Sequence, residues 1–110
     1  MILKVDAKAM MEFHKKIDKP FEVTVNGESM QPTLYNGDIV RISCDKEYKI
    51  GDIVLFKYRD EGDLLHRIIS IENNVYSCKG DNALRIEYIL FRHIIGKVVS
   101  VYRNECIFYI

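Results

Sequence analysis

No part of the sequence has the long uncharged apolar stretch that a membrane span requires. Charged side chains recur through the first 20 residues, at Lys4, Asp6, Lys8, Glu12, Lys15, Lys16, Asp18 and Lys19. A helix that crosses a bilayer needs about 20 predominantly apolar residues, and a secretory signal peptide needs a shorter, uninterrupted apolar region. We therefore expect a soluble, cytoplasmic protein without an integral membrane anchor.

The sequence also lacks an excess of charge of either sign. Lysine and arginine together number 16, as do aspartate and glutamate, so the formal net charge is zero. Domains that bind nucleic acid or anionic membranes usually present a strongly basic surface. The balanced charge therefore gives no electrostatic reason to expect nucleic acid as a partner.

Cysteine is scarce and is not arranged for metal or redox chemistry. The three cysteines, Cys44, Cys78 and Cys106, are odd in number and far apart in the sequence, so no pair has metal-site or redox-motif spacing. We expect free thiols in a reducing compartment. No Cys/His cluster, paired-carboxylate motif or glycine-rich phosphate loop occurs either, so neither a metal nor a cofactor is expected.

The pattern of apolar residues predicts a mainly β protein with one N-terminal helix. Residues 6–17 repeat apolar side chains with helical periodicity, and Pro20 ends that pattern. The expected strands that follow are residues 21–26, 38–43, 53–58, 64–71, 75–78, 94–102 and 107–110. Asn73-Asn74, between two of them, is typical of a tight hairpin turn. Many short strands separated by turns indicate a barrel or sandwich.

The length and uniform composition indicate a single domain. The 110 residues are enough for one hydrophobic core, and no linker, repeat or low-complexity segment divides them. We therefore interpret residues 1–110 as one unit, with a helical segment over residues 1–20 and a β-rich core over residues 21–110.

The segment from Gly27 to Leu34 is the most unusual local feature. It follows an expected strand and contains Pro32, so it leaves the sheet instead of continuing the strand. A serine at that point, Ser29, would lie at the lip of a sheet among backbone N–H groups that face outward. This geometry suits a nucleophile beside an oxyanion hole, although a serine in a turn more often only shapes the turn.

Five segments, in order along the chain, resemble the conserved boxes of signal peptidase I and of LexA-like self-cleaving repressors: residues 25–38, 51–56, 65–69, 79–82 and 94–98. The first carries the Ser-Met-x-Pro-Thr pattern, and the fourth reads Lys-Gly-Asp-Asn. The resemblance implies the coiled β-sheet catalytic domain of that superfamily. It also implies that Ser29 is the nucleophile and that His66, in the third segment, is the general base.

The base and the acid are the informative positions within this superfamily. Most bacterial members have lysine as base, whereas His66 resembles the histidine-type branch found in endoplasmic-reticulum and archaeal signal peptidases. A histidine titrates near neutrality without much tuning. Two acids are candidates to orient its ring. Asp81, in the Lys-Gly-Asp-Asn motif, is preferred, and Glu87 is the alternative.

The resemblance also indicates which residues surround the nucleophile. Gly27, Met30 and Pro32 are expected to shape the oxyanion and substrate-positioning region. Some signal peptidases place a serine two residues before the nucleophile, and its hydroxyl helps to bind the oxyanion. Gly27 occupies that position here, so the backbone N–H of Ser29 must provide most of the oxyanion hole.

The function implied is a serine endopeptidase that cleaves an extended peptide, such as a leader or precursor peptide, with a Ser-His dyad or a triad. One alternative is an inactive peptide-binding module. Another is a LexA-like self-cleaving regulator, which would need a DNA-binding domain that residues 1–20 are too few to form. The oligomeric state stays open.

Overall fold

The structure, a computed structural model, describes residues 19–110, so the expected helix over residues 6–17 lies outside the described residues. Within residues 19–110 the chain forms eight strands and one short 3-10 helix. Their bounds are β1 Phe21–Thr24, β2 Ile39–Ser43, β3 Ile53–Lys57, β4 Asp63–Glu72, β5 Val75–Lys79, β6 Ile86–Leu90, η1 Phe91–His93, β7 Ile94–Arg103 and β8 Cys106–Tyr109. Within residues 19–110, no helix is long and apolar enough to cross a membrane.

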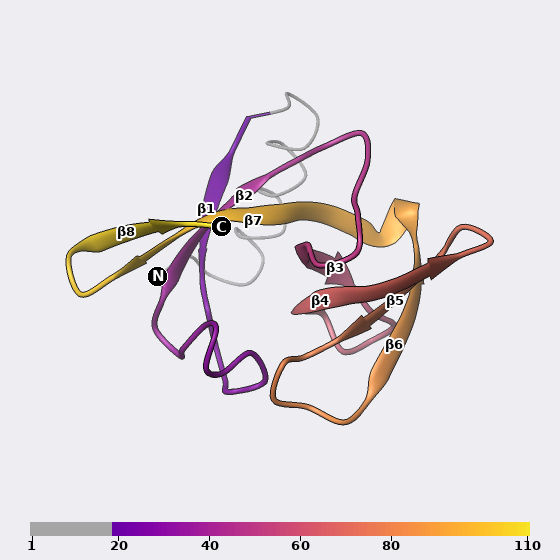
Figure 1. Ribbon diagram of the computed structural model, residues 1–110, viewed down its shortest axis with the longest axis horizontal. Helices are drawn as coiled ribbons and strands as arrows, with labels where there is room; N and C mark the ends of the chain where they lie inside the picture. The colour runs from indigo at the N-terminus through magenta and orange to yellow at the C-terminus, as the bar shows by residue number, and fades with distance from the viewer. Residues whose placement is uncertain (1–18) are drawn as a thin grey trace.

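The strands form one curled antiparallel sheet, which confirms the predicted mainly β fold. Their order is β1-β2-β7-β3-β4-β5-β6, and β8 pairs with β7 outside that path. Figure 1 shows β7 running across the molecule between the β1–β2 pair and the group formed by β3, β4, β5 and β6. The long strand β7 therefore joins the two halves of the sheet.

Local sequence accounts for most of the turns. Asn73 and Asn74 form the predicted two-residue turn between β4 and β5, with φ of 49° and 64°. Asn104 and Glu105 form a similar turn between β7 and β8, with φ of 52° and 63°. Asparagine tolerates this left-handed region better than most residues, which suits it to tight hairpins.

The curled sheet encloses two clusters of buried apolar side chains. One contains Phe21, Val25, Met30, Leu34, Val40, Ile42, Ile53, Leu55, Ile95, Val98 and Val101. The other contains Tyr48, Val54, Phe56, Tyr58, Ile68, Cys78, Ile89 and Ile94. Successive side chains of a strand point to opposite faces, and β3 contributes alternately to the two clusters. This explains why β3 reads as a continuous apolar run, Ile-Val-Leu-Phe, and not as an alternating one.

The loop that carries Ser29, residues 26–37, is closed at its base by backbone pairing. The Val25 N–H donates to the Asp38 carbonyl, and the Gly37 N–H donates to the Val25 carbonyl, each at 2.8 Å. Asp38 is only 4% exposed, and its carboxylate accepts the Tyr35 N–H at 2.8 Å. Arg103 of β7 donates to both carboxylate oxygens of Asp38, at 2.9 and 2.6 Å. The pair therefore fastens the loop to β7.

Because Arg103 hydrogen-bonds to Asp38, the pKa of the Asp38 carboxyl lies below its usual value. A lowered pKa in the folded state stabilises the protein above the unfolded pKa, and that stability is lost as pH falls through the folded pKa. We expect Asp38→Asn to lower the free energy of unfolding by about 1–3 kcal/mol at pH 7. The deficit should shrink below about pH 4. Denaturant unfolding measured from pH 3 to pH 7 tests this.

The surface pair between Lys97 and Asp45 provides the control. These two side chains approach to 3.0 Å, but they are 27% and 37% exposed. Exposed pairs contribute at most about 1 kcal/mol, so Asp45→Asn should change stability by less than Asp38→Asn at every pH. An equal loss in the two variants, or a deficit of Asp38→Asn that does not change with pH, would contradict the assignment.

Candidate active site

The backbone around Ser29 is anchored by its apolar neighbours. Met30 is 2% exposed and Leu34 is fully buried, both in the first core cluster. The Leu34 N–H donates to the Met30 carbonyl at 2.9 Å, which closes a turn between them. Ser29 therefore sits immediately beside a buried anchor, while its own side chain is only partly buried. This is how the sequence places a hydroxyl at a fixed point on the surface of the core.

His66 meets Ser29 from the opposite side, on β4. It lies across from Val54 of β3 in the sheet register and is 6% exposed. Its ring lies edge-on to Phe56, with centroids 6.2 Å apart. The Ser29 Oγ is 3.0 Å from His66 Nε2. A hydroxyl that donates to a ring nitrogen at this distance is within the reach required for proton transfer.

The other ring nitrogen of His66 contacts Glu87, on β6. The Nδ1 atom is 2.7 Å from Glu87 Oε1, and the Glu87 side chain is 1% exposed. Because Nδ1 faces a carboxylate, its proton is held there, and Nε2 is left to accept a proton from Ser29. Ser29, His66 and Glu87 thus form one continuous chain of contacts across three separate parts of the fold.

Asp81, the acid preferred from the sequence, occupies a different position. Arg67 donates to both of its carboxylate oxygens, from Nε at 2.9 Å and from Nη2 at 2.8 Å. The Thr33 hydroxyl also donates to Asp81, at 2.6 Å. The Arg67 hydrogen bonds hold the pKa of Asp81 below its usual value. The expected contact between Asp81 and His66 is therefore replaced by a bridge between the Ser29 loop and β4.

The loop between β5 and β6 holds the Ser29 segment in place. The Asn82 N–H donates to the Ser29 carbonyl at 2.8 Å, and the Asn82 side chain donates to the Glu28 carbonyl at 3.2 Å. The Asp81 N–H donates to the Met30 sulfur at 3.4 Å. The Lys-Gly-Asp-Asn motif thus positions the backbone around Ser29, and Glu87, farther along the chain, reaches His66.

Gly80 is required by close packing of this loop against Ser29 and His66. A Cβ at Gly80 would lie 2.6 Å from the Ser29 carbonyl oxygen and 3.1 Å from His66 Cδ2. The first of these atoms is backbone and cannot move aside cheaply. We expect Gly80→Ala to shift Ser29 relative to His66 and to lower kcat by about 10²-fold. Steady-state kinetics on a cleaved peptide would measure this.

Gly96→Ala is a matched control for that prediction. A Cβ at Gly96 would be as crowded, 2.6 Å from Ile42 Cγ2 and 2.8 Å from the Ser43 carbonyl oxygen, where β2 pairs with β7. Both variants should lose about 1–3 kcal/mol of stability, but only Gly80→Ala should lose kcat. Equal kcat values for the two variants at a temperature where both are folded would contradict a specific role for Gly80.

Of the residues expected to shape the oxyanion region, none contributes a side-chain donor in this geometry. The Gly27 N–H donates to Asn36 Oδ1 at 2.9 Å, and its φ of 90° suits glycine at a sharp turn. Met30 is a core anchor. Pro32 is exposed and follows a cis peptide bond. Within residues 19–110 the Ser29 N–H donates to no backbone carbonyl, so it remains the backbone donor beside Oγ.

Of the three cysteines, Cys78 lies across from Glu87 in the sheet register. All three thiols are free. Burial, together with the charge of Glu87, raises the pKa of the Cys78 thiol to about 12, so it stays protonated near neutrality. Across the described range 19–110, no three residues among His, Cys, Asp and Glu are grouped to hold a metal ion.

Comparison with models of protein families agrees with the fold. A model of the family described as Peptidase S24-like matches residues 4–99, which is most of the chain. No curated protein matches the sequence significantly. The match supports the superfamily of LexA and signal peptidase I that the five segments resemble. Because the match spans well over half of the sequence, the chain belongs to the Peptidase S24-like family.

Proposed function

We propose that this protein is a serine endopeptidase of the histidine type, with Ser29 as nucleophile, His66 as general base and Glu87 as the acid that orients the base. The observation that carries the proposal is the continuous chain of contacts, 3.0 Å from Ser29 Oγ to His66 Nε2 and 2.7 Å from His66 Nδ1 to Glu87 Oε1. Membership of a peptidase family supports the same reaction class. A serine that only shapes a turn would not require contact with a buried histidine that itself contacts a buried carboxylate.

The reaction is acyl transfer in two steps. His66 Nε2 accepts the Ser29 hydroxyl proton as Oγ attacks the scissile carbonyl, and Glu87 stabilises the imidazolium that forms. The Ser29 N–H stabilises the oxyanion. His66 then protonates the leaving amine, and an ester forms between Ser29 and the acyl part of the substrate. Water, deprotonated by His66, attacks this ester and restores the free hydroxyl.

The substrate we propose is an extended segment of a peptide or precursor protein, such as a leader peptide. The outermost strand β1 continues directly into the loop that carries Ser29, so a chain added alongside the sheet near this end would be presented to the hydroxyl. The resemblance implies small side chains just before the cut. The free thiols, Cys106 among them on the surface, support a reducing compartment such as the cytoplasm.

Digestion of a defined peptide mixture tests the proposal. Purified protein would be incubated with synthetic extended peptides of varied sequence, and new termini would be identified by mass spectrometry. We expect cleavage at a restricted set of sites after small residues by the wild type, and none by Ser29→Ala. New termini produced equally by the wild type and by Ser29→Ala would show that this serine does not carry the activity.

A further inference from the structure

The carboxylate of Glu87 has a second partner that the proposed triad does not use. Its Oε1 faces His66, while Oε2 accepts a hydrogen bond from Arg85 Nε at 3.0 Å. Glu87 is 1% exposed. A buried carboxylate is costly unless both of its oxygens are paired. Arg85 therefore places a positive charge beside Oε2, the carboxylate oxygen that does not contact His66.

Arg85 is itself held in place by a second carboxylate and an aromatic ring. Its Nη1 and Nη2 donate to the two carboxylate oxygens of Glu61, at 3.0 and 2.8 Å. Its guanidinium lies 5.1 Å from the ring centre of Tyr58. Hydrogen bonds to Glu61 and then Glu87 raise the pKa of Arg85, so its charge is permanent. Glu61 lies in the β3–β4 connection, which places the anchor outside the β5–β6 loop.

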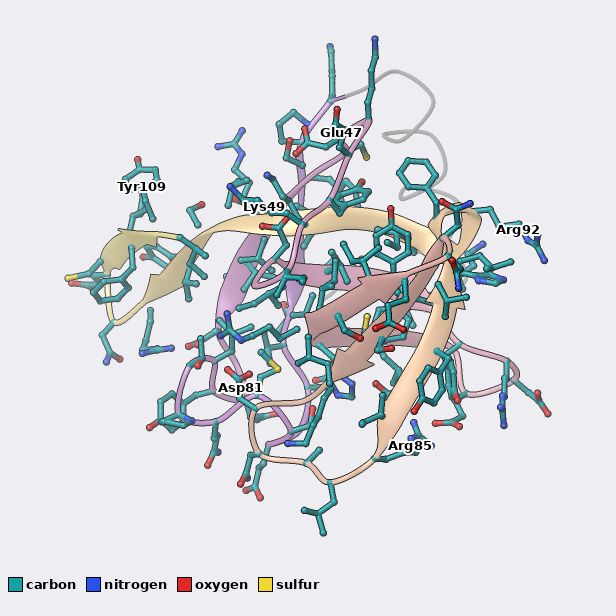
Figure 2. The ribbon with its side chains drawn as sticks, turned by 45° about the vertical axis from the view of Figure 1, so that its right-hand side comes forward. Glu47, Lys49, Asp81, Arg85, Arg92 and Tyr109 are labelled. Atoms are coloured by element: carbon teal, nitrogen blue, oxygen red, sulfur yellow. The ribbon has the colours of Figure 1, made fainter. Side chains whose placement is uncertain are left out.

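Figure 2 shows Arg85 and Asp81 at the two ends of the loop that connects β5 to β6. Asp81 at one end binds Arg67, and Arg85 at the other end reaches Glu61 and Glu87. The two ion-pair systems are thus separate. The Asp81 system fastens the nucleophile loop, whereas the Arg85 system contacts the acid behind the base.

We propose that Arg85 is a positioning residue of the active site, which fixes the Glu87 carboxylate against His66 and lowers the pH at which the His66–Glu87 pair takes up a proton. The expected effect of Arg85 on catalysis rests on the proposed function. Its expected effect on proton uptake by the pair does not, because proton uptake is a property of the folded protein alone. An arginine is suited to this position because its planar guanidinium group can donate hydrogen bonds to two carboxylates at once.

The sign of the effect follows from the charges that face the pair. These are Arg85 on the approach to β6, whose Nε binds Glu87, and Glu61 in the β3–β4 connection, which binds Arg85. Cys78 lies directly across from Glu87 and is uncharged near neutrality because its pKa is raised to about 12. Removal of the Arg85 charge favours proton uptake by the pair, whichever of the two residues holds the proton. Removal of the Glu87 charge has the opposite effect on His66.

The test compares Arg85→Met, Arg85→Lys, Glu87→Gln and Arg59→Met. Arg59 also lies over Tyr58, with its guanidinium 5.0 Å from the ring centre, so Arg59→Met removes the same charge from the same ring without touching Glu87. Proton uptake at His66 would be followed by NMR of its ring nitrogens against pH, and the acidic limb of kcat/KM would be followed in parallel. Thermal unfolding of each variant would establish the range in which it is folded.

We expect the midpoint in Arg85→Met to move upward by about half a pH unit or more, and the midpoint in Glu87→Gln to move downward. Arg85→Lys should restore the midpoint in part and Arg59→Met should leave it near that of the wild type. At a pH where the pair is deprotonated, Arg85→Met should lower kcat by about 10-fold with little change in KM.

An unmoved midpoint in both Arg85→Met and Arg85→Lys, or an equal upward shift in Arg59→Met, would overturn the proposal for Arg85. That result would leave the proposed function intact if wild-type cleavage still required Ser29. Conversely, if the wild type cleaves no peptide, the proposed function fails, but the NMR midpoints still decide whether Arg85 sets proton uptake by the pair.

Discussion

Glu87→Gln is expected to lower kcat/KM by about 10³- to 10⁴-fold, the loss that follows when the acid of a serine peptidase triad becomes an amide. An amide group that donates to His66 Nδ1 leaves the ring proton on Nε2, where it faces the Ser29 hydroxyl and prevents general-base catalysis. The Glu87 side chain is 1% exposed and 2.7 Å from Nδ1, so water cannot easily take its place. Steady-state kinetics on a cleaved peptide measures the loss.

Asp81→Asn is the comparison that separates the two acids. It removes charge from the bridge to Arg67 and Thr33 and should loosen the loop that carries Ser29, with a loss of kcat/KM of about 10-fold or less. Both variants keep the size of the side chain, so packing is matched. If Asp81→Asn has the larger effect and Glu87→Gln retains activity, the acid is the one preferred from the sequence motif and the observed contact of Glu87 is not catalytic.

Ser29→Ala and His66→Ala are each expected to reduce kcat by about 10⁴-fold or more, with the folded structure unchanged. When nucleophile and base act as a unit, the double variant is scarcely worse than either single variant. We therefore expect the double variant to show the same residual rate within about 10-fold, instead of the product of the two losses. Multiplicative losses would mean that Ser29 and His66 do not act in one step, despite the 3.0 Å contact between them.

All strands except β6, and the contact between Ser29 and His66, could be predicted because their signals are local or belong to recognisable boxes. Alternation of apolar side chains over residues 21–26 predicted β1, and Asn73-Asn74 marked the turn between β4 and β5. Ser29 and His66 were found through the segments around them, and their contact arises because β4 passes the loop that Met30 and Leu34 anchor in the core.

The strand β6 was not predicted from the sequence, and Glu87 on it was only the alternative to Asp81 as the acid beside His66. In the run Ile-Glu-Tyr-Ile-Leu the inward positions are Glu87 and Ile89, while Ile86 and Tyr88 are exposed. Hydrophobicity alone favours the opposite orientation, with Ile86 and Tyr88 inside. The register of β6 on β5, which places Glu87 across from Cys78, decides the orientation, and register depends on contacts distant in sequence.

The sequence motif favoured Asp81 as the acid, and the sequence alone did not show which residue the Asp81 carboxylate contacts. Its motif lies close to the site, but the residue that follows the base, Arg67, engages both of its oxygens. Side-chain partners across strands are set by pairing of β4 with β5. Motif comparison does not show that an aspartate will bind an arginine on the neighbouring strand. The burial of Glu87 is likewise visible only in the folded chain.

Covalent labelling of the intact protein by a fluorophosphonate probe tests the central claim most directly, because it needs no knowledge of the substrate. Mass spectrometry of the whole chain and of its peptides would report the stoichiometry and the site. We predict one label per chain on Ser29 in the wild type, at a rate that falls by at least about 10²-fold in His66→Ala and in Glu87→Gln, and no label in Ser29→Ala. Labelling at another residue, or labelling of Ser29 that is equally fast without His66, would contradict an active site built on Ser29, His66 and Glu87.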